Sequence, residues 1–492
     1  MADPYNDCTS TSALLTDLYE LTMAYGYWKT GMAEREAVYN LFYRTNPFGG
    51  GFCVACGLDA VIDYLSRVRF TESDIDYLAG LRSSDGSPVF ETAFLDYLAG
   101  LSLVPDVDGV PEGTVVFPHE PLLRVTGPLI AGQIIETALL NIINFQTLIA
   151  TKASRVCLAA ESDSVLEFGL RRAQGHDGGL SASRAAYIGG CAATSNVLAG
   201  KRYGIPVKGT HAHSWVMAFD SEEESFRAYA DAMPGNCIFL VDTYDTITGV
   251  RNAVTVGKRL RERGYEMIGI RLDSGDPGRL GGEARKILDG EGFENAAIVA
   301  SGDLDEYSIA ELKKNDSPIS VWGVGTRLVT GYGDPALGGV YKLAALRGDD
   351  GGWEYRIKLS EEVSKMTIPG ILQVRRFRQG EGFVRDVMYD AERGMPERAE
   401  AVDISDPAVR TALPADGEWD DVLVPVFRAG EIVYERPSIG EIRSRALAQV
   451  SHLDDSVRRL DKPARYPVGL ERGLHDMRDT LVRDRRSVEG ET

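Results

Sequence analysis

The middle of the chain, from about residue 160 to 330, repeats one pattern: a short apolar run, then a small or charged residue, then a helical stretch. Each such unit is about 25 to 40 residues long, which is the length of one strand and its helix. Six units predict a parallel sheet. Their strand ends are VLEFGLRR (165–172), PVKGTHAHS (206–214), IFLVDTYDT (238–246), MIGIRLDSGD (267–276), AIVASGDLDE (297–306) and VWGVGTR (321–327).

Two α/β folds fit such a pattern, a barrel and a doubly wound sheet, and both bind ligands at the carboxyl ends of their strands. The regular units, with no GxGxxG after the first strand, favour the barrel. Valines and leucines recur on one face of TGVRNAVTVGKRLRERG (248–264), which predicts an amphipathic helix that ends at Gly264. The apolar stretch 128–150 contains five amide or acidic residues, so it predicts a buried helix pair and no bilayer span.

The two ends of the chain differ from the middle. Residues 1 to about 130 and about 345 to 435 alternate short strands with turns. They predict a second, β-containing domain built from both ends, so we divide the chain at 1–130, 131–345 and 346–492, with residues 1–12 disordered. The last sixty residues are expected to be helical, because apolar side chains recur every three or four residues from Ile442 to Leu460, until Pro463 breaks the pattern.

The charge balance limits the possible partners. A formal net charge of -20 and a pI near 4.9 argue against a broad nucleic-acid surface, although a local basic pocket for a small anion remains possible. The six cysteines include one lone CxxC, Cys53 and Cys56, which we interpret as reduced, buried thiols. The first residues lack the pattern of a secretory signal. We therefore expect a cytoplasmic protein that binds neither nucleic acid nor membrane.

Two strand ends that contain glycine indicate sites for a phosphorylated sugar. In VWGVGTRL, Gly323 and Gly325 leave backbone N–H groups exposed before the next helix, and such groups can hold a phosphate, although GxG turns are common. In SGDLDE, Gly302 and Asp303 end another strand. The Asp303 carboxylate could accept hydrogen bonds from ribose hydroxyls or, equally, cap the following helix.

Arginines gather at the same predicted edge. Arg271 and Asp273 in RLDSGD could form a simple ion pair, or Arg271 could bind an anion while Asp273 binds a ribose or Mg²⁺. Arg171 and Arg172, after EFG, add further positive charge. Arginines that converge in an acidic protein indicate an anionic substrate.

The stretch GTHAHSWVMAF (209–219), expected to be strand and turn, holds His211 and His213. The sequence has no Walker A, HExxH or GxSxG motif and no zinc-spaced cluster, so the commonest hydrolases and a resident metal are not expected. A histidine here can be a general base, a nucleophile or a spectator. Asp242, at the next strand end, is placed to accept a hydrogen bond from the ring N–H of this histidine and so to fix the tautomer of the histidine.

Six strand ends, taken in order, resemble those of the nicotinate phosphoribosyltransferases. They are EFGLRRAQG, GTHAHSWVMAF, LVDTYDT, RLDSGD, SGDLDEY and WGVGTRL. Segments near both chain ends are similar to that family too: LLTDLYELTMAYGYWKTG, FYRTNPFGGGF and YPVGLERGLHDMRDTLV. The resemblance extends from about residue 13 to 485 and rests on no single motif.

The resemblance implies an incomplete α/β barrel in the middle of the chain, a sandwich-like domain from its two ends, and a homodimer with shared active sites. The implied reaction joins nicotinate to phosphoribosyl pyrophosphate and gives nicotinate mononucleotide and pyrophosphate. It is driven by ATP hydrolysis, needs Mg²⁺, and is the entry step of NAD salvage from nicotinate.

The resemblance also assigns roles to residues. His213 matches the histidine that ATP phosphorylates transiently, Asp242 the carboxylate that orients it, and His211 a neighbour. Phe168 and Tyr19 of the partner subunit would sandwich the pyridine ring, with Asp17 beside that tyrosine. The remaining contacts are Arg171 and Arg271 to phosphate and ring carboxylate in an undecided order, Asp273, Gly302 and Asp303 to the ribose, and Gly323, Gly325 and Thr326 to the 5′-phosphate.

The choice of base rests on CAATSNVLAG (191–200), where nicotinamide-using relatives carry an aspartate and this chain has Ser195 and Asn196. Loss of that charge favours nicotinate, because an aspartate would repel the ring carboxylate. One alternative is a nicotinamide- or quinolinate-type transferase, the latter decarboxylating and independent of ATP. Another is an inactive barrel kept as a metabolite-binding subunit, but such a copy should have lost strand-end residues and none is missing.

Overall fold

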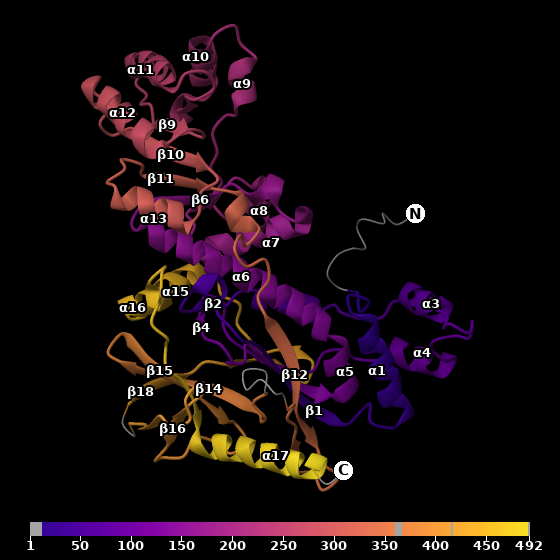
Figure 1. Cartoon of the computed structure of the whole chain (residues 1–492). Coiled ribbons are helices and arrows are strands. Elements are labelled where there is room, and N and C mark those ends of the chain that lie inside the picture. Colours follow the sequence, from indigo (N-terminus) through magenta and orange to yellow (C-terminus); the bar gives the residue numbers. More distant parts are fainter. Residues whose placement is uncertain (1–11, 360–366, 415–416, 491–492) are drawn as a thin grey trace. The chain divides into compact units, whose positions relative to one another are not determined.

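The computed structural model describes residues 12–359, 367–414 and 417–490 (Figure 1). The chain forms two compact units: unit 1 is Met1–Thr147, Ala336–Ser438 and Ala448–Thr492, and unit 2 is Leu148–Pro335 with Ile439–Leu447. The barrel domain expected at residues 131–345 overlaps unit 2 and is longer at both ends. Most of the segment 1–12, expected to be disordered, lies outside the described residues, but Ser12 is described and forms a bridge with Arg69.

Unit 2 is built on one parallel sheet with the strand order β7-β6-β11-β10-β9-β8. All five of its strand pairs are parallel, as the strand and helix pattern predicts. Val207 adds a single parallel bridge to Thr194 beyond β7. The strands are β6 (Ser164–Glu167), β7 (Ala193–Thr194), β8 (Ile238–Leu240), β9 (Gly269–Leu272), β10 (Ala297–Gly302) and β11 (Val321–Val324).

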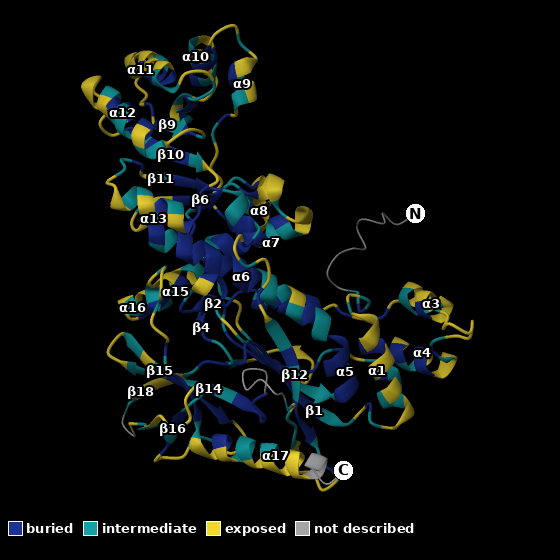
Figure 2. Cartoon of the chain, in the orientation of Figure 1, coloured by how far each residue is buried: buried dark blue, intermediate teal, exposed yellow. Residues whose placement is uncertain are grey.

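Helices connect these strands, and one more, α14, follows the last strand. They are α7 (Gly175–Ile188), α8 (Val197–Tyr203), α9 (His213–Met217), α10 (Glu222–Ala232), α11 (Thr246–Glu262), α12 (Pro277–Gly290), α13 (Glu306–Lys314) and α14 (Thr326–Val329). The helix predicted to end at Gly264 is α11: Asp245 caps its first turn, and Gly264 follows it with φ +79°. Its apolar face is buried and its charged face is exposed, whereas β6 and β11 are largely buried (Figure 2). This arrangement confirms the predicted α/β class.

Unit 1 contains two larger sheets and a short β2-β4 pair, with the orders β13-β12-β1-β5-β3-β19-β20 and β17-β16-β21-β15-β14-β18. Strand β1 pairs with β5 on one side and with the distant β12 on the other, which confirms a β-containing domain built from both chain ends. The strands are β1 (Glu36–Tyr43), β2 (Cys53–Val54), β3 (Asp106–Gly109), β4 (Val115–Val116), β5 (Leu123–Pro128), β12 (Gly339–Arg347), β13 (Trp353–Tyr355), β14 (Leu372–Gln379), β15 (Gly382–Asp390), β16 (Glu400–Asp403), β17 (Arg410–Ala412), β18 (Glu418–Asp421), β19 (Val424–Arg428), β20 (Glu431–Ile432) and β21 (Val468–Glu471).

The N-terminal part of unit 1 is more helical than its alternating pattern predicted. It contains α1 (Leu18–Lys29), α2 (Leu58–Leu65), α3 (Glu72–Gly80) and α4 (Thr92–Ala99). Helices α1 and α4 share an aromatic cluster, in which the Tyr25 and Trp28 rings lie 5.0 and 5.7 Å from the ring of Phe94. A capping box starts α3, with Thr71 and Asp74 bonded to each other's backbone N–H.

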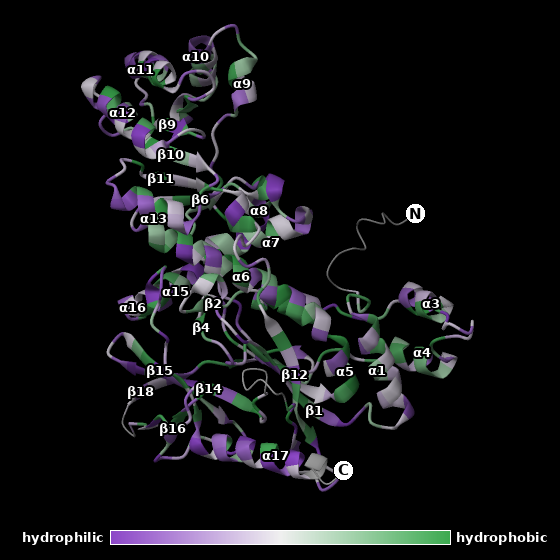
Figure 3. Ribbon diagram, in the orientation of Figure 1, coloured by the Kyte–Doolittle hydropathy of each residue, from purple (hydrophilic) through white to green (hydrophobic). Residues whose placement is uncertain are grey.

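The apolar stretch 128–150 forms the predicted helix pair, α5 (Leu129–Ile134) and α6 (Glu136–Ala160). Along α6, hydrophobic and hydrophilic residues alternate (Figure 3), and none of the described helices is long and apolar enough to cross a membrane. The C-terminal helix expected to continue to Pro463 is interrupted. It divides into α15 (Ile439–Ser451) and α16 (Asp455–Arg458), because Asp454 caps a new helix, and α17 (Arg472–Gly490) follows β21.

Candidate active site

The carboxyl ends of the parallel strands of unit 2 bring the predicted site residues to one edge of the sheet. In the strand register, Val324 lies between Glu167 and Gly302, and Leu272 lies beside Ala300. The residues that follow these positions therefore leave the sheet at the same edge. They include Phe168 and Gly325.

Arg271 forms hydrogen bonds with three other side chains at this edge. Its guanidinium donates from Nη2 to Asp273 Oδ1 at 2.6 Å, from Nε to Ser301 Oγ at 2.8 Å and from Nη1 to Thr210 Oγ1 at 3.0 Å. The ion pair that the sequence left open is thus present. Burial alone would raise the pKa of Asp273, but the hydrogen bond from Ser301 and the charge of Arg271 outweigh it and hold that pKa below its usual value.

Phe168 offers a flat, half-buried ring beside this guanidinium. The Cζ atom of Arg271 lies 5.9 Å from the centroid of the ring. The ring also packs against Gly323, where an added Cβ would lie 2.8 Å from Phe168 Cδ2. The backbone is fixed as well, because Phe168 N donates to Val324 O at 2.8 Å. An aromatic anion could stack on this ring and pair with the arginine.

The two glycine-containing strand ends differ in exposure: Gly302 is exposed, whereas Gly323 is buried inside β11, so the expectation that its backbone N–H is exposed is wrong, and only Gly325 follows the strand. Gly302 has φ +112°, a left-handed conformation that favours glycine, and Asp303 beside it is exposed. The cap of helix α13 is Asp305, which accepts from Tyr307 N and Ser308 N and pairs with Arg327 at 2.5 Å. The capping alternative for Asp303 is therefore wrong. Gly325 and Thr326 start α14 at the end of β11.

His213 begins α9, so the expectation of strand and turn around it is wrong. Its Nδ1 lies 3.1 Å from Thr243 Oγ1, and its Nε2 lies 3.8 Å from Asp273 Oδ2. The side chain is 39% exposed, which leaves the ring open to a ligand.

Asp242 has a different partner from the expected His213 ring. Its Oδ2 accepts hydrogen bonds from Asp273 N at 2.8 Å, Ser274 N at 2.6 Å and Ser274 Oγ at 2.7 Å. In this structure Asp242 orders the loop after β9, and Thr243 supports the His213 ring. Asp242 Oδ1 is buried and has no hydrogen-bond partner among the described residues.

His211 is a structural neighbour of this site. It is buried, and its Nε2 accepts a hydrogen bond from Leu240 N of β8 at 3.2 Å. Its ring lies 4.9 Å from the ring of Tyr229 and 5.9 Å from that of Phe226. Burial lowers the pKa of His211 to about 4, which keeps the imidazole neutral and able to accept this bond.

The remaining predicted residues lie in different surroundings. Asn196 is 1% exposed and caps α8, whereas Ser195 is half-buried and Arg171 is exposed. Asp17 and Tyr19 belong to unit 1, at the start of α1, where half of Tyr19 is exposed. Sequence reasoning missed several polar partners at the strand ends, because their contacts arise only in the fold: Glu167, Ser183, Thr194, Thr210, Thr243, Ser301 and Arg327.

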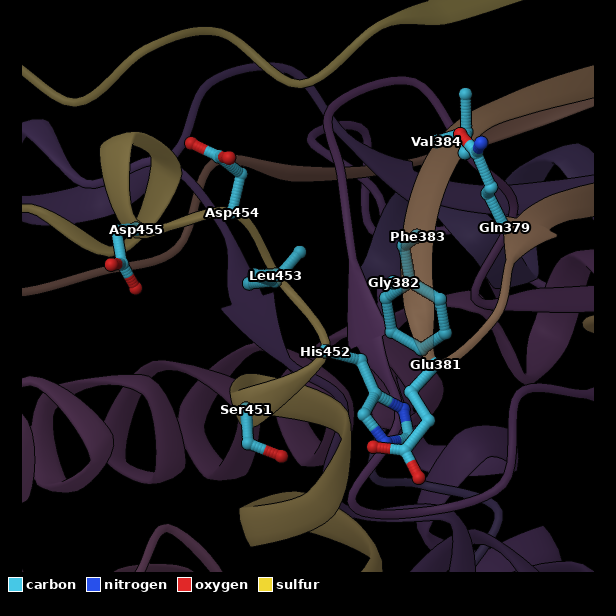
Figure 4. A pocket seen from close by; sticks show the side chains of 10 residues that line it. All are labelled: Gln379, Glu381, Gly382, Phe383, Val384, Ser451, His452, Leu453, Asp454 and Asp455. Atoms are coloured by element: carbon cyan, nitrogen blue, oxygen red, sulfur yellow. The ribbon is translucent and has the colours of Figure 1, made fainter.

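A separate cavity of about 620 Å³ lies in unit 1, near the loop after α15 (Figure 4). The rings of Phe383 and His452 lie edge to face in it, 5.3 Å apart. Two of its three carboxylates have local roles, since Asp454 caps α16 and Asp455 pairs with Arg458. The strand ends of unit 2 therefore remain the candidate site.

Comparisons with known proteins identify the family. Family models match three segments: the nicotinate phosphoribosyltransferase N-terminal domain at residues 14–144, the nicotinate phosphoribosyltransferase family at 164–348 and the C-terminal domain at 373–478. The chain is 42% identical over 466 residues to a nicotinate phosphoribosyltransferase of Bacillus subtilis, covering 93% of this chain and 92% of the relative. It is 39% identical over 460 residues to one of Mycobacterium tuberculosis, covering 93% and 91%.

Solved structures give the same result. The crystal structure of human nicotinic acid phosphoribosyltransferase matches with a TM-score of 0.82 and 32% identity, covering 95% of this chain and 99% of the human chain. A nicotinate-nucleotide pyrophosphorylase from Pyrococcus furiosus shares the fold, with a TM-score of 0.68 at 22% identity, covering 89% and 95%. With family models that match three of its segments and relatives of this similarity along almost its whole length, the chain belongs to the nicotinate phosphoribosyltransferase family.

Proposed function

We propose that this protein transfers the phosphoribosyl group of phosphoribosyl pyrophosphate to the ring nitrogen of nicotinate and releases pyrophosphate, coupled to ATP hydrolysis, as an entry step of NAD salvage. The observation that carries the proposal is the placement of Arg271 between the Phe168 ring and Asp273, at the edge that also holds His213. The similarity to nicotinate phosphoribosyltransferases supports it.

Binding of the ring follows from shape and charge. Nicotinate is a flat aromatic carboxylate, so one face stacks on Phe168 while its carboxylate meets Arg271 or the exposed Arg171. The second face is covered by Tyr19 of the partner subunit in a homodimer, in agreement with the half-exposed position of Tyr19 on α1. Asp17 lies beside this tyrosine in the sequence, and Ser195 borders the same strand edge.

Transfer itself needs charge stabilisation more than a strong base. As the bond from ribose C1 to pyrophosphate breaks, positive charge grows on the ribose, and the ring nitrogen then forms the new bond. Asp273, Gly302 and Asp303 hold the ribose, and the backbone at Gly325 and Thr326, which follows the buried Gly323, holds the 5′-phosphate.

Mg²⁺ fits the residues at this edge. Asp242 Oδ1 is a buried carboxylate oxygen without a partner among the described residues, and the other oxygen of Asp242 accepts a hydrogen bond from the backbone N–H of Asp273. Mg²⁺ commonly binds one or two carboxylates together with substrate phosphates, so Asp242 and Asp273 would hold it. When bound, the ion neutralises charge on the pyrophosphate. Among the residues that the structure describes, no group of three or more His, Cys, Asp or Glu side chains could bind a metal alone.

Coupling to ATP is assigned to His213. In the tautomer whose Nδ1–H donates to Thr243 Oγ1, the lone pair of Nε2 is free to attack the γ-phosphorus of ATP. The N–P bond forms as the bond to the β-phosphate oxygen breaks and ADP leaves, and water later cleaves the phosphoramidate to phosphate. The cytoplasm is the compartment we propose, because the described cysteines are all free thiols.

Pyrophosphate release tests the proposal. The protein is supplied with phosphoribosyl pyrophosphate, Mg²⁺ and one of nicotinate, nicotinamide or quinolinate, with and without ATP. We expect turnover of nicotinate, stimulation by ATP, and loss of that stimulation in His213→Ala. The matched control is His452→Ala, which changes a histidine of the unit 1 cavity and leaves the stimulation intact.

Each other outcome points to a specific alternative. Preference for nicotinamide or quinolinate would replace nicotinate as the base. Equal ATP stimulation in His213→Ala would remove the phosphohistidine step. Failure of all three bases would leave the inactive, metabolite-binding alternative.

A further inference from the structure

Glu167 is the last residue of β6 and precedes Phe168, yet it is not one of the predicted site residues. Its side chain is fully buried. Within the described ranges of the chain, no lysine, arginine or histidine forms an ion pair with it. An isolated buried carboxylate is costly unless hydrogen bonds compensate it, so its partners indicate why it is there.

The two oxygens of Glu167 bind different parts of the strand edge. Oε1 accepts a hydrogen bond from the backbone N–H of Gly169, in the turn that follows Phe168. Oε2 accepts from Thr194 Oγ1 at 2.5 Å and from Ser183 Oγ at 2.9 Å. One carboxylate therefore ties the Phe168 turn to β7 and to helix α7.

The hydroxyl protons then set the direction of a longer chain of hydrogen bonds. Ser183 Oγ also lies 2.9 Å from Gly179 O, but its single proton goes to the carboxylate, which is the stronger acceptor. Its oxygen is then free to accept from Asn196 Nδ2 at 3.1 Å, while Gly179 O accepts from the same amide at 3.4 Å. Thr194 Oγ1 likewise accepts from Asn196 N at 3.0 Å.

Every polar atom of the Asn196 side chain has a hydrogen-bond partner. Both of its amide protons have acceptors, and its Oδ1 accepts from Ala199 N at 3.2 Å. While Ser183 donates to Glu167, this amide orientation is the one in which Asn196 Nδ2 donates to Ser183 Oγ and Oδ1 accepts from Ala199 N. Because Asn196 is 1% exposed, it acts on the site through the backbone beside it, where Ser195 N donates to Glu167 O at 2.9 Å.

We infer that Glu167 is a positioning residue for the pyridine-binding pocket: its carboxylate fixes the direction of the Ser183, Thr194 and Asn196 hydrogen bonds and joins them to the Phe168 turn. The inference rests on the proposed function for the identity of the ligand. It also links positions 167 and 196, because the Ser183 hydroxyl has one proton and cannot donate to two carboxylates. An acidic residue at position 196 is therefore compatible only with a neutral residue at position 167, because the single Ser183 proton can then go to position 196.

Glu167→Gln tests the inference, because its amide keeps the shape but offers N–H groups where two hydroxyls now donate. We expect the KM for nicotinate to rise about tenfold or more, while kcat and the KM for phosphoribosyl pyrophosphate change less than about threefold. Thr194→Val, which removes one donor, should raise the nicotinate KM by a smaller factor, and Thr194→Ser, which keeps the hydroxyl, should restore it. Glu306→Gln is the matched control, since Glu306 is also fully buried in unit 2 but pairs with Lys152 and Arg155.

The predicted dependence between positions 167 and 196 gives a second test. Asn196→Asp alone should lower the thermal midpoint and raise the nicotinate KM, and adding Glu167→Gln should recover part of both. A Glu167→Gln enzyme with an unchanged nicotinate KM would overturn the inference, as would additive effects of the two substitutions. If Glu167→Gln does not fold, the Thr194→Val and Thr194→Ser pair decides. Absence of nicotinate turnover in the unmodified protein would instead refute the proposed function.

Discussion

Replacing Gly323 with alanine should damage nicotinate binding specifically. The new Cβ would lie 2.8 and 3.0 Å from Cδ2 and Cε2 of Phe168 and 3.3 Å from Ser301 Cβ. Carbon atoms normally pack at about 3.5–4.0 Å, so the ring must move by roughly 0.7 Å. The backbone cannot follow easily, because Phe168 N is bonded to Val324 O and Glu167 is held on both oxygens. The movement therefore falls on the side-chain torsions, at a cost of about 1 kcal/mol.

A misplaced ring affects a stacked ligand more than it affects stability. We expect the KM for nicotinate to rise about 10- to 100-fold, with the thermal midpoint lowered by only a few degrees. Steady-state kinetics with each substrate varied in turn measures this. Gly282→Ala in α12 is the matched control, because nothing lies within 4 Å of its added Cβ. A Gly323→Ala enzyme with a nicotinate KM within about twofold of the original would refute the packing argument, and so would an equal effect in a Phe168→Leu background.

Three further substitutions address separate contacts. Arg271→Lys keeps the positive charge but not the planar guanidinium with its three hydrogen bonds, so kcat/KM for nicotinate should fall about 100-fold. A loss of kcat/KM below about threefold would contradict this. Lys152→Met leaves the buried Glu306 with one cation fewer and should lower the urea unfolding free energy by about 3 kcal/mol, whereas a loss under about 1 kcal/mol would show that the pair contributes little. His211 is neutral when folded, with its pKa lowered to about 4, but protonates near its ordinary pKa when unfolded. Its share of stability is therefore complete above about pH 6.5 and is lost as the pH falls towards 4. Between pH 7 and 5, His211→Gln should lose about 2 kcal/mol less unfolding free energy than the unmodified protein, and parallel pH profiles would exclude His211 as the cause.

The strands that could be predicted from the sequence are those where a run of Val, Ile or Phe ends in a charged residue, as in β8, β9 and β10. Two features escaped this pattern. Strand β7 has only Ala193 and Thr194, too few residues to show a period. The stretch 206–214 forms one bridge at Val207, in a segment where Pro206 cannot donate to a ladder.

The candidate site likewise has features that could be predicted from the sequence and features that could not. Charges at the strand ends of a parallel sheet must meet at one edge, which is why Arg271 and Asp273 could be placed together from the sequence. The choice of partner could not be made in the same way. Asp242 bonds the loop at Ser274, and Thr243 takes the His213 ring, because the loop conformations decide which of two neighbouring groups reaches it.

The pairing of β1 with β12 has a consequence for biosynthesis. Ala37 of β1 faces Leu346, so this edge of the strand stays unpaired until roughly 300 more residues have left the ribosome, about 15 to 60 seconds at common rates of translation. The six strands of unit 2 are all made within that interval, and their sheet can form first. Strand β1 meanwhile presents an unpaired edge, and six of its seven buried residues are hydrophobic. The nascent chain is thus most open to aggregation, and to capture by chaperones, at its own first strand.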